Sequence, residues 1–283
     1  MAKGAAVTLL DFDKEAIKAR EKEVAKESDQ EIMDRIKDRF TILEDMTKGV
    51  RKGDVRAMIV SGPPGVGKSF GVEAVLTKDD LFDKMGERKP RYEIVKGAMS
   101  AIGLYSKLYE FSNRGNVLVF DDCDSVLLDE LSLNILKAAL DSSKKRTISW
   151  NTDSRVLRSE GIPNSFEFQG SAIFITNIKF EHVRSKKLRD HLDALESRCH
   201  YLDLTIDTTR EKILRIKQIV GDGMLDGYDL DDAAKSEVVQ FIEVNKDKMR
   251  ELSLRMVIKV ADLRAAMPDK WMNVAALTCM KRG

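Results

Sequence analysis

The chain has 283 residues, with 48 lysines and arginines against 47 aspartates and glutamates, so its formal net charge is +1. Hydrophobic residues make up 43% and charged residues 34%, which excludes a disordered or fibrous chain and a uniformly basic nucleic-acid coat, while local basic patches stay possible. This length predicts one large domain accompanied by a smaller one.

Cysteines and apolar runs bear on the compartment of the protein. Cys123, Cys199 and Cys279 are too scattered to predict a disulfide framework or a zinc site. No stretch approaches the roughly 18 apolar residues of a membrane span, and the N-terminal apolar run turns acidic at once, unlike a signal peptide. We therefore expect a cytoplasmic protein with no membrane partner.

Residues 1–49 are expected to form a charged helical extension. Ile32, Ile36, Phe40 and Leu43 recur at a helical spacing and predict an amphipathic helix over about 29–49. Residues 12–27 are compatible with a solvated helix or an arm. The extension either lies on the surface of its own chain or reaches a neighbouring subunit.

Strand and helix patterns alternate through residues 50–206. Apolar runs predict strands at 57–61, 92–95, 116–121, 172–176 and 201–205. Helical spacing predicts helices over about 67–77, 100–113, 129–141 and 185–197. Such alternation indicates an α/β fold, a parallel sheet with helices on both faces.

After residue 206 only helical periods remain. They run through 208–220, 231–246, 253–266 and 270–280, with a glycine-rich break at 221–229. Residues 207–283 are therefore expected to form a small all-helical domain that follows the α/β core of residues 50–206 in the sequence.

A phosphate-binding loop follows the first predicted strand. The pattern G-x-x-x-x-G-K-[ST] is matched by Gly62, Pro63, Pro64, Gly65, Val66, Gly67, Lys68 and Ser69. Its glycines let backbone N–H groups wrap a phosphate chain, and the following helix adds its dipole. Lys68 provides charge for the outer phosphates and Ser69 a hydroxyl for Mg²⁺. We assign these residues, with Phe70 after them, to binding of ATP or GTP.

An acidic strand end complements this loop. The apolar run 117–120 ends in Asp121 and Asp122. A carboxylate at the end of a neighbouring strand lies beside the loop, where it can hold Mg²⁺. The sequence therefore predicts Ser69 and Asp121 as the magnesium pair.

The phosphate loop and the acidic strand end resemble motifs of the AAA+ ATPases. The resemblance covers about residues 30–265. Residues 62–69 are similar to the Walker A motif of that family and residues 117–122 to its Walker B motif. The resemblance implies a parallel-sheet P-loop NTPase core with a helical lid, and ATP with Mg²⁺ as cofactors. The residue that polarises the attacking water is usually Glu in the family, and here it is Asp122, which carries the same charge on a shorter side chain. Asp124 falls where some DNA-working relatives carry a second acid.

Two more positions resemble parts of the AAA+ active site. Asn177, at the end of the strand 172–176, matches the polar sensor 1 residue, which helps to position water. Arg198, in Ser-Arg-Cys, resembles that motif of clamp-loader subunits and the arginine finger of the family. Such an arginine reaches the nucleotide of an adjacent subunit. The alternative is an intramolecular ion pair of Arg198 with Glu196 or Asp203.

The helical domain offers a third such position. Arg255 is similar to sensor 2, the arginine through which the lid senses the γ-phosphate, and Arg264 is its competitor on the same helix. Together with Arg198, this resemblance implies a homo-oligomer, a ring or spiral of about five to seven subunits. A simple kinase or GTPase switch is disfavoured, because the helical domain and the position of Arg198 argue against it.

Two basic loops are candidates for contact with a nucleic-acid substrate. Residues 142–170 are longer than a simple connection and resemble the hairpin inserted before sensor 1 in several AAA+ branches. This segment and residues 179–189 hold the cations Lys144, Lys145, Arg146, Arg155, Arg158, Arg184, Lys186 and Lys187. Such loops suit contact with a phosphate backbone, although ordinary solvated loops have the same composition.

The segment 97–103 is compatible with two structures. AAA+ unfoldases place an aromatic pore loop here, but Ala101 stands where the aromatic residue would be, so a helix-capping turn around Ser100 is favoured. Two classes of function remain. One is an oligomeric ATPase acting in DNA metabolism, of a replication or phage type, in the host cytoplasm if phage-encoded. The other is an ATPase that remodels a protein partner.

Overall fold

The computed structural model describes residue 15 and residues 17–85 and 90–281. These residues form two compact units. One contains Phe40–Gly62 and Lys68–Leu204, and the other contains the described part of Met1–Arg39 with Pro63–Gly67 and Thr205–Gly283.

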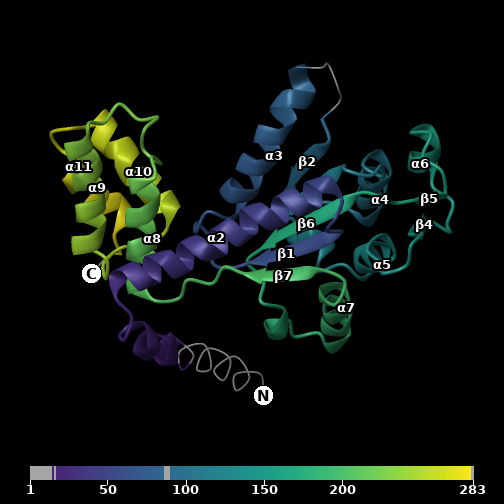
Figure 1. The fold of residues 1–283 in the computed structure, drawn as a ribbon, viewed down its shortest axis with the longest axis horizontal. Helices are drawn as coiled ribbons and strands as arrows, with labels where there is room; N and C mark the ends of the chain where they lie inside the picture. Colours follow the sequence, from purple (N-terminus) through teal and green to yellow (C-terminus); the bar gives the residue numbers. More distant parts are fainter. Residues whose placement is uncertain (1–14, 16, 86–89, 282–283) are drawn as a thin grey trace. The chain divides into compact units, whose positions relative to one another are not determined.

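A five-stranded parallel sheet forms the centre of the first unit (Figure 1). Its strands are β1 (Ala57–Ser61), β2 (Tyr92–Lys96), β3 (Val117–Asp121), β6 (Ser171–Thr176) and β7 (His200–Asp203), in the spatial order β2-β3-β6-β1-β7. Every residue of β1, β3 and β6 is buried, which explains their continuous apolar runs. The predicted α/β fold class, with a parallel sheet at its core, is confirmed.

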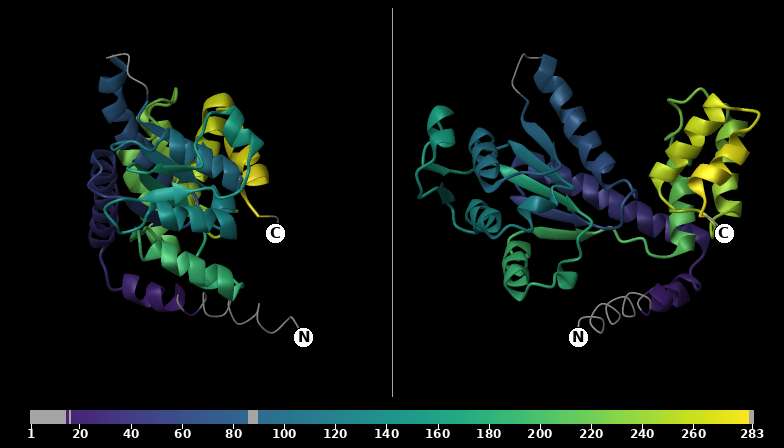
Figure 2. Two further views of the ribbon diagram at one scale, coloured as in Figure 1. Left: turned by 90° about the vertical axis from the view of Figure 1, so that its right-hand side faces the viewer. Right: turned by 180° about the vertical axis from the view of Figure 1, so that it is seen from behind.

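Helices cover both faces of this sheet, as right-handed crossovers require. The helix after β1 is α3 (Lys68–Met85), whereas α4 (Ala101–Glu110), α5 (Glu130–Ala139) and α7 (Lys186–Glu196) follow the other strands. Alternate strand residues such as Ile59, Phe120 and Phe174 share one buried cluster with α4, α5 and α7. These three helices therefore lie on one face, and α3 lies on the other (Figure 2).

The predicted insertion before the fourth strand of the core is confirmed. β4 (Thr147–Ser149) pairs antiparallel with β5 (Ser165–Glu167), and the short helix α6 (Arg155–Ser159) lies between them. Aromatic contacts attach this hairpin to α4, because the ring of Tyr105 lies 5.1 Å from that of Phe166 and its hydroxyl donates to the Pro163 carbonyl at 2.9 Å.

Four helices form the core of the second unit. They are α8 (Thr209–Gly221), α9 (Asp232–Val244), α10 (Leu254–Ala266) and α11 (Trp271–Cys279), close to their predicted bounds. They surround a core that includes Val238, Val257 and Trp271. Within the described ranges, no helix is long and apolar enough to cross a membrane.

The predicted N-terminal amphipathic helix is confirmed as α2 (Asp29–Lys52). The chain is also helical over 17–24, and residues 12–14 and 16 lie outside the described part. Glu211 ties this segment to α8, because its carboxylate accepts from Arg20 at 3.1 Å and from Arg35 at 3.0 Å. Glu211 also forms a capping box with Thr208 at the start of α8.

The charge of Glu211 predicts an acid-sensitive unit. Burial alone would raise the pKa of Glu211, but hydrogen bonds from the Thr208 amide, Arg20 and Arg35 outweigh it and hold that pKa below its ordinary value. A lowered folded-state pKa stabilises the fold fully above the unfolded-state pKa, about 4.3, and this contribution is lost as pH falls through the folded-state pKa.

We expect Glu211→Gln to lower the free energy of unfolding at pH 7 by about 2–4 kcal/mol, since two arginines lose their buried partner. Denaturant unfolding at pH 7 and pH 3 measures this. The difference between wild type and variant should shrink at pH 3. Glu73→Gln, at an exposed position of α3, is the matched control. Equal stability of wild type and Glu211→Gln at pH 7 would contradict the proposed role.

Candidate functional site

The phosphate-loop motif connects β1 to α3, as its pattern requires. Gly62, Gly65 and Gly67 have φ of 150°, 72° and 105°, values that residues with a side chain rarely adopt. A Cβ at Gly62 would also lie 3.0 Å from the backbone of Leu204. The glycines are therefore needed by the local backbone, which is the property that lets such a loop wrap phosphates.

Lys68, the first residue of α3, is buried, with 6% of its surface exposed. Its Nζ donates to the Gly62 carbonyl at 2.6 Å and to Asn177 Oδ1 at 2.7 Å. Asn177 comes within reach because β1 and β6 are neighbours and Ser61 is paired with Thr176. The loop lysine and the predicted sensor 1 residue are thus in direct contact.

The predicted magnesium pair is also brought together. Ser69 Oγ donates to Asp121 Oδ1 at 2.7 Å, and Asp121, the last residue of β3, is buried. The second carboxylate oxygen of Asp121 faces Lys96 Nζ at 3.5 Å. Proteins usually supply only one or two ligands to Mg²⁺, and water molecules and phosphate oxygens complete its coordination. One hydroxyl and one carboxylate fit that pattern. No group of three or more histidines, cysteines or acids among the described residues could hold a metal.

Asp122 has an unusual backbone conformation. Its φ of 50° makes it the single non-glycine residue in the described part of the chain with positive φ. Aspartate tolerates this region better than most residues, although the conformation still costs about 1 kcal/mol. The Asp122 amide donates to the Ile175 carbonyl at 3.0 Å, and its exposed carboxylate accepts from Asn177 Nδ2 at 2.8 Å. Such strain is typical of functional positions.

Asp124 supports this end of the sheet. It begins a short 3-10 helix, η1 (Asp124–Val126), and its Oδ1 accepts from the Thr176 hydroxyl at 3.0 Å. The same hydroxyl accepts from the Ile178 amide at 3.0 Å. Asp124 therefore holds the turn that carries Asn177.

In the helical unit, the middle of the phosphate loop is bonded to the start of α10. The Leu254 amide donates to the Gly65 carbonyl at 2.8 Å, and a Cβ at Gly65 would lie 2.6 Å from that of Ser253. Arg255 is exposed and forms no hydrogen bond or ion pair with the residues that the structure describes. Its competitor Arg264 is instead bonded to Glu237 at 2.8 Å.

Arg198 follows the end of α7. Its Nη1 donates to the Ala194 carbonyl at 2.5 Å, and its Nε is buried without a hydrogen-bond partner. It forms no ion pair with Glu196 or Asp203 within the described chain. Beside it, burial raises the pKa of the Cys199 thiol to about 12, so this cysteine packs as an apolar residue.

The predicted nucleic-acid cations fall into three groups. Arg146 is buried, and its guanidinium donates to the carbonyls of Ala139 and Gly170, both at 3.1 Å, so it is not available to a phosphate backbone. Arg158 is paired with Asp153 at 3.0 Å and Lys187 with Glu130 at 2.5 Å. The remaining cations are exposed and form no ion pair with described residues: Lys144, Lys145, Arg155, Arg184 and Lys186.

The segment 97–103 contains the favoured capping turn. Ser100 is the N-cap of α4, and its hydroxyl accepts from the Gly103 amide at 3.2 Å. Phe70, one residue beyond the phosphate loop, is 77% exposed.

Sequence reasoning missed Lys96 and Thr176. Both end a strand at the carboxyl edge of the sheet, and Lys96 is paired with Asp121 in the register of β2 and β3. Ligands of open α/β sheets bind outside this edge. A search of every predicted strand for polar residues at its carboxyl end would have found them.

The sheet order, the loop between β1 and α3, and the polar groups at the carboxyl edge define a parallel α/β fold that carries a phosphate-loop motif. The chain belongs to the family of the uncharacterized 36.7 kDa protein in the nrdC-mobD intergenic region of Enterobacteria phage T4. The two are 34% identical over 256 residues, which cover 89% of this chain and 77% of that protein. No protein-family model matches the chain.

Solved structures resemble the chain more distantly. Replication initiator DnaA bound to AMPPCP and single-stranded DNA has a TM-score of 0.43 at 12% identity and covers 79% of this chain. NtrX from Brucella abortus has a TM-score of 0.43 at 12% identity and covers 94% of it. The chain spans 59% of the length of each of these structures. A likeness this low bears on neither ligand nor activity.

Proposed function

We propose that the protein hydrolyses ATP with Mg²⁺ as an oligomeric AAA+ ATPase. The observation that carries the proposal is the hydrogen-bonded set at the carboxyl edge of the sheet. It contains Lys68, Asn177 and Asp122 in one chain of contacts and Ser69 with Asp121 beside it. These are the groups that phosphoryl transfer needs, placed by three strands that share one edge.

Each residue then has a distinct role. Lys68 binds the outer phosphates, exchanging the Gly62 carbonyl for phosphate oxygens. Ser69 and Asp121 hold Mg²⁺, which, when bound, neutralises charge that develops on the phosphates. Asp122 accepts a proton from, or orients, the attacking water, and Asn177 holds the Asp122 carboxylate in place.

Assembly into a ring or spiral of about five to seven subunits is proposed from Arg198 and Arg255. Neither side chain forms an ion pair with a described acid, so both charges remain for an anionic partner. Arg198 would reach the nucleotide of an adjacent subunit, as in the Ser-Arg-Cys motif of clamp loaders, and Arg255 the nucleotide of its own subunit.

DNA, or a complex on DNA, is the substrate that we propose. The supporting observation is a set of five exposed cations that form no ion pair with the described residues, in a chain whose net charge is +1. They are Lys144, Lys145, Arg155, Arg184 and Lys186. Remodelling of a protein without DNA is the alternative. The segment 97–100 supports it only weakly, because it is largely exposed and lacks an aromatic residue to grip a polypeptide.

The rate of ATP hydrolysis with and without DNA separates these substrates. We expect single- or double-stranded DNA to stimulate hydrolysis at low salt, with the effect falling at moderate salt as counterion release predicts. Arg155→Gln with Arg184→Gln should weaken the stimulation, whereas Lys52→Gln with Lys78→Gln, at exposed sites elsewhere, should not. Absence of both stimulation and salt-dependent DNA binding would refute the DNA substrate.

A further inference from the structure

Cations gather at one end of the helical unit, just after α9 and α11. The segments that follow these two helices run antiparallel, because Met249 is bridged to Met280 and the Lys281 amide donates to the Lys248 carbonyl at 2.8 Å. Met249 belongs to the core of the helical unit, and Met280 packs against that core. Neighbouring residues of an extended segment point to opposite sides, and Lys248 and Lys281 are both exposed. Two lysines therefore stand opposite each other on paired segments.

The cations at this end have no counter-ion among the described residues. Lys246, Lys248, Arg250 and Lys281 are all exposed, and none of them forms an ion pair with a described acid. One acid, Asp247, lies in the same turn. Like charges that face each other on paired segments repel, so an acidic partner would stabilise this basic end.

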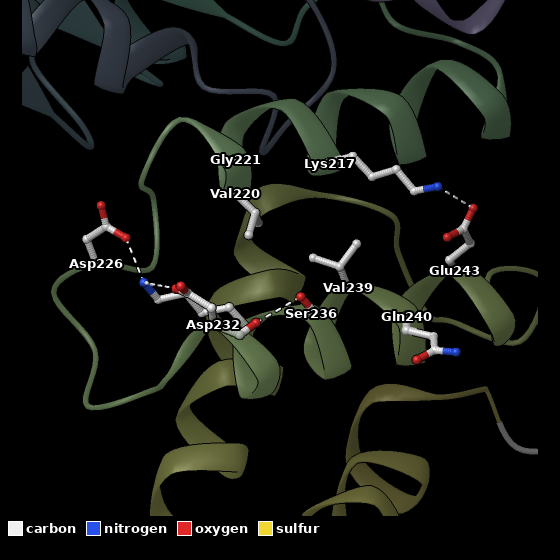
Figure 3. A pocket seen from close by; sticks show the side chains of 10 residues that line it. Lys217, Val220, Gly221, Asp226, Asp232, Ser236, Val239, Gln240 and Glu243 are labelled. Carbon is white, nitrogen blue, oxygen red and sulfur yellow. Dashed lines mark hydrogen bonds and ion pairs between the residues drawn. The ribbon is translucent and has the colours of Figure 1, made fainter.

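A pocket elsewhere in the helical unit shows the contrast (Figure 3). It has a volume of about 570 Å³ and is lined by residues of α8, of α9 and of the segment that joins them. There Lys217 is bonded to Glu243 at 2.7 Å, and Lys235 to Asp226 at 2.8 Å (Figure 3). Both lysines of that pocket are neutralised by acids of the same pocket, whereas the cations of the basic end are not.

Large apolar side chains are exposed at the ends of the same two helices. Val244, the last residue of α9, is 75% exposed, and Leu277, in the last turn of α11, is 82% exposed. Met272, also on α11, is 51% exposed. A phosphate backbone does not bury such groups, whereas a peptide that combines apolar side chains with acids buries them and neutralises the cations. The basic end therefore fits an acidic, apolar segment of a protein.

The N-terminal sequence of this chain has that chemistry. Residues 7–13, which lie outside the described part, are VTLLDFD and combine four large apolar residues with two aspartates. The described residues nearest to them, 17–19, are exposed. Residues 5–19 contain no glycine or proline, the residues that most readily reverse a chain. We therefore expect the chain to continue away from its own helical unit, and ten residues can span up to about 35 Å.

We propose that residues 7–13 of one copy of this chain bind the basic end of the helical unit of a second copy. The apolar side chains of the segment cover Val244 and Leu277. Its two aspartates pair with the surrounding cations and relieve their repulsion. This contact involves no residue of the phosphate loop and requires no nucleotide, so it goes beyond the proposed ATPase function.

A peptide titration tests the surface. The probe is a fluorescently labelled peptide of residues 4–15, and the receptor is full-length Leu10→Ser with Phe12→Ser protein, whose own segment lacks two apolar anchors. Fluorescence anisotropy should show saturable binding that weakens as salt is added. Addition of Lys248→Glu with Lys281→Glu to the receptor should weaken binding about 10-fold or more, because both reversed charges would repel the aspartates of the peptide.

Controls separate the apolar and the charged parts of the contact. Leu277→Ser, at a position too exposed to support the fold, should also weaken binding about 10-fold, through lost apolar burial. Lys52→Glu with Lys78→Glu, at exposed sites outside the helical unit, should leave binding unchanged. No saturable binding, or unchanged binding to the Lys248→Glu with Lys281→Glu receptor, would overturn the inference. Loss of DNA binding by that receptor with intact peptide binding would also overturn it and would assign the cations to DNA.

Cross-linking establishes which copy provides the segment. Unlabelled and ¹⁵N-labelled wild-type protein are mixed and treated with a carbodiimide, which joins a carboxylate to a nearby lysine amine. Mass spectrometry should find Asp11 or Asp13 linked to a lysine of the basic end in pairs that combine the two isotopes. Links confined to one isotope would place the segment on its own chain and overturn the inference. Neither measurement needs ATP, so an inactive ATPase would leave this contact standing, and failure of the contact would leave the proposed ATPase standing.

Discussion

Lys68→Ala is expected to weaken ATP binding severely. In the structure, Lys68 Nζ is buried and donates to the Gly62 carbonyl and to Asn177, in the place where the loop would hold the outer phosphates. Removal of one partner of a buried, hydrogen-bonded charge pair costs about 2–5 kcal/mol, which is roughly a 30- to 5,000-fold loss of affinity. Calorimetric titration with a non-hydrolysable ATP analogue and Mg²⁺ measures this loss.

Lys78→Ala is the control for this experiment, because it removes an exposed lysine from the same helix, α3. It should bind the analogue like wild type. Circular dichroism and thermal unfolding of Lys68→Ala establish that the variant is folded. Tight binding by a folded Lys68→Ala protein would refute the assignment of the phosphate loop.

The elements that determine the fold could be predicted because their sequence signals are local. The strand 57–61 is predicted and observed at the same residues, since all five residues are buried and the single polar one, Ser61, stands at its end. The helix after the phosphate loop, predicted to end near Thr77, continues to Met85. Residues 78–85 contain no glycine or proline to stop it.

Contacts between distant segments could not be predicted in the same way. Arg146 has the same local signature as Lys144 and Lys145, and only the packing of the insertion on the sheet shows that it is buried. The positive φ of Asp122 and its bond to Asn177 depend on the pairing of β3 with β6. Motif order predicts which residues belong to a site, whereas their partners require the register of the sheet.

Arg198→Ala is expected to spare ATP binding and to lower turnover by about 10³-fold or more, the effect of losing an arginine finger. The structure supports a role outside the subunit, since Arg198 pairs with no described acid and stands just before β7, at the amino edge of the sheet, whereas Lys68 lies at the carboxyl edge. Arg189→Ala is the control on α7, because its guanidinium bonds to the Val183 carbonyl within the subunit. Steady-state hydrolysis and calorimetric titration, measured on each variant, separate turnover from binding.

Mixing Arg198→Ala with Asp122→Ala tests whether the site is shared. Each variant alone lacks one half of every site, so each should be inactive. In a randomly mixed ring, about one interface in four joins an intact Asp122 to an intact Arg198 from the neighbouring subunit. Activity should therefore return to about a quarter of the wild-type rate, and a larger excess of either variant should lower it again. If Arg198 acted within its own subunit, no mixing ratio would restore hydrolysis, and the proposed ring would lose its main support.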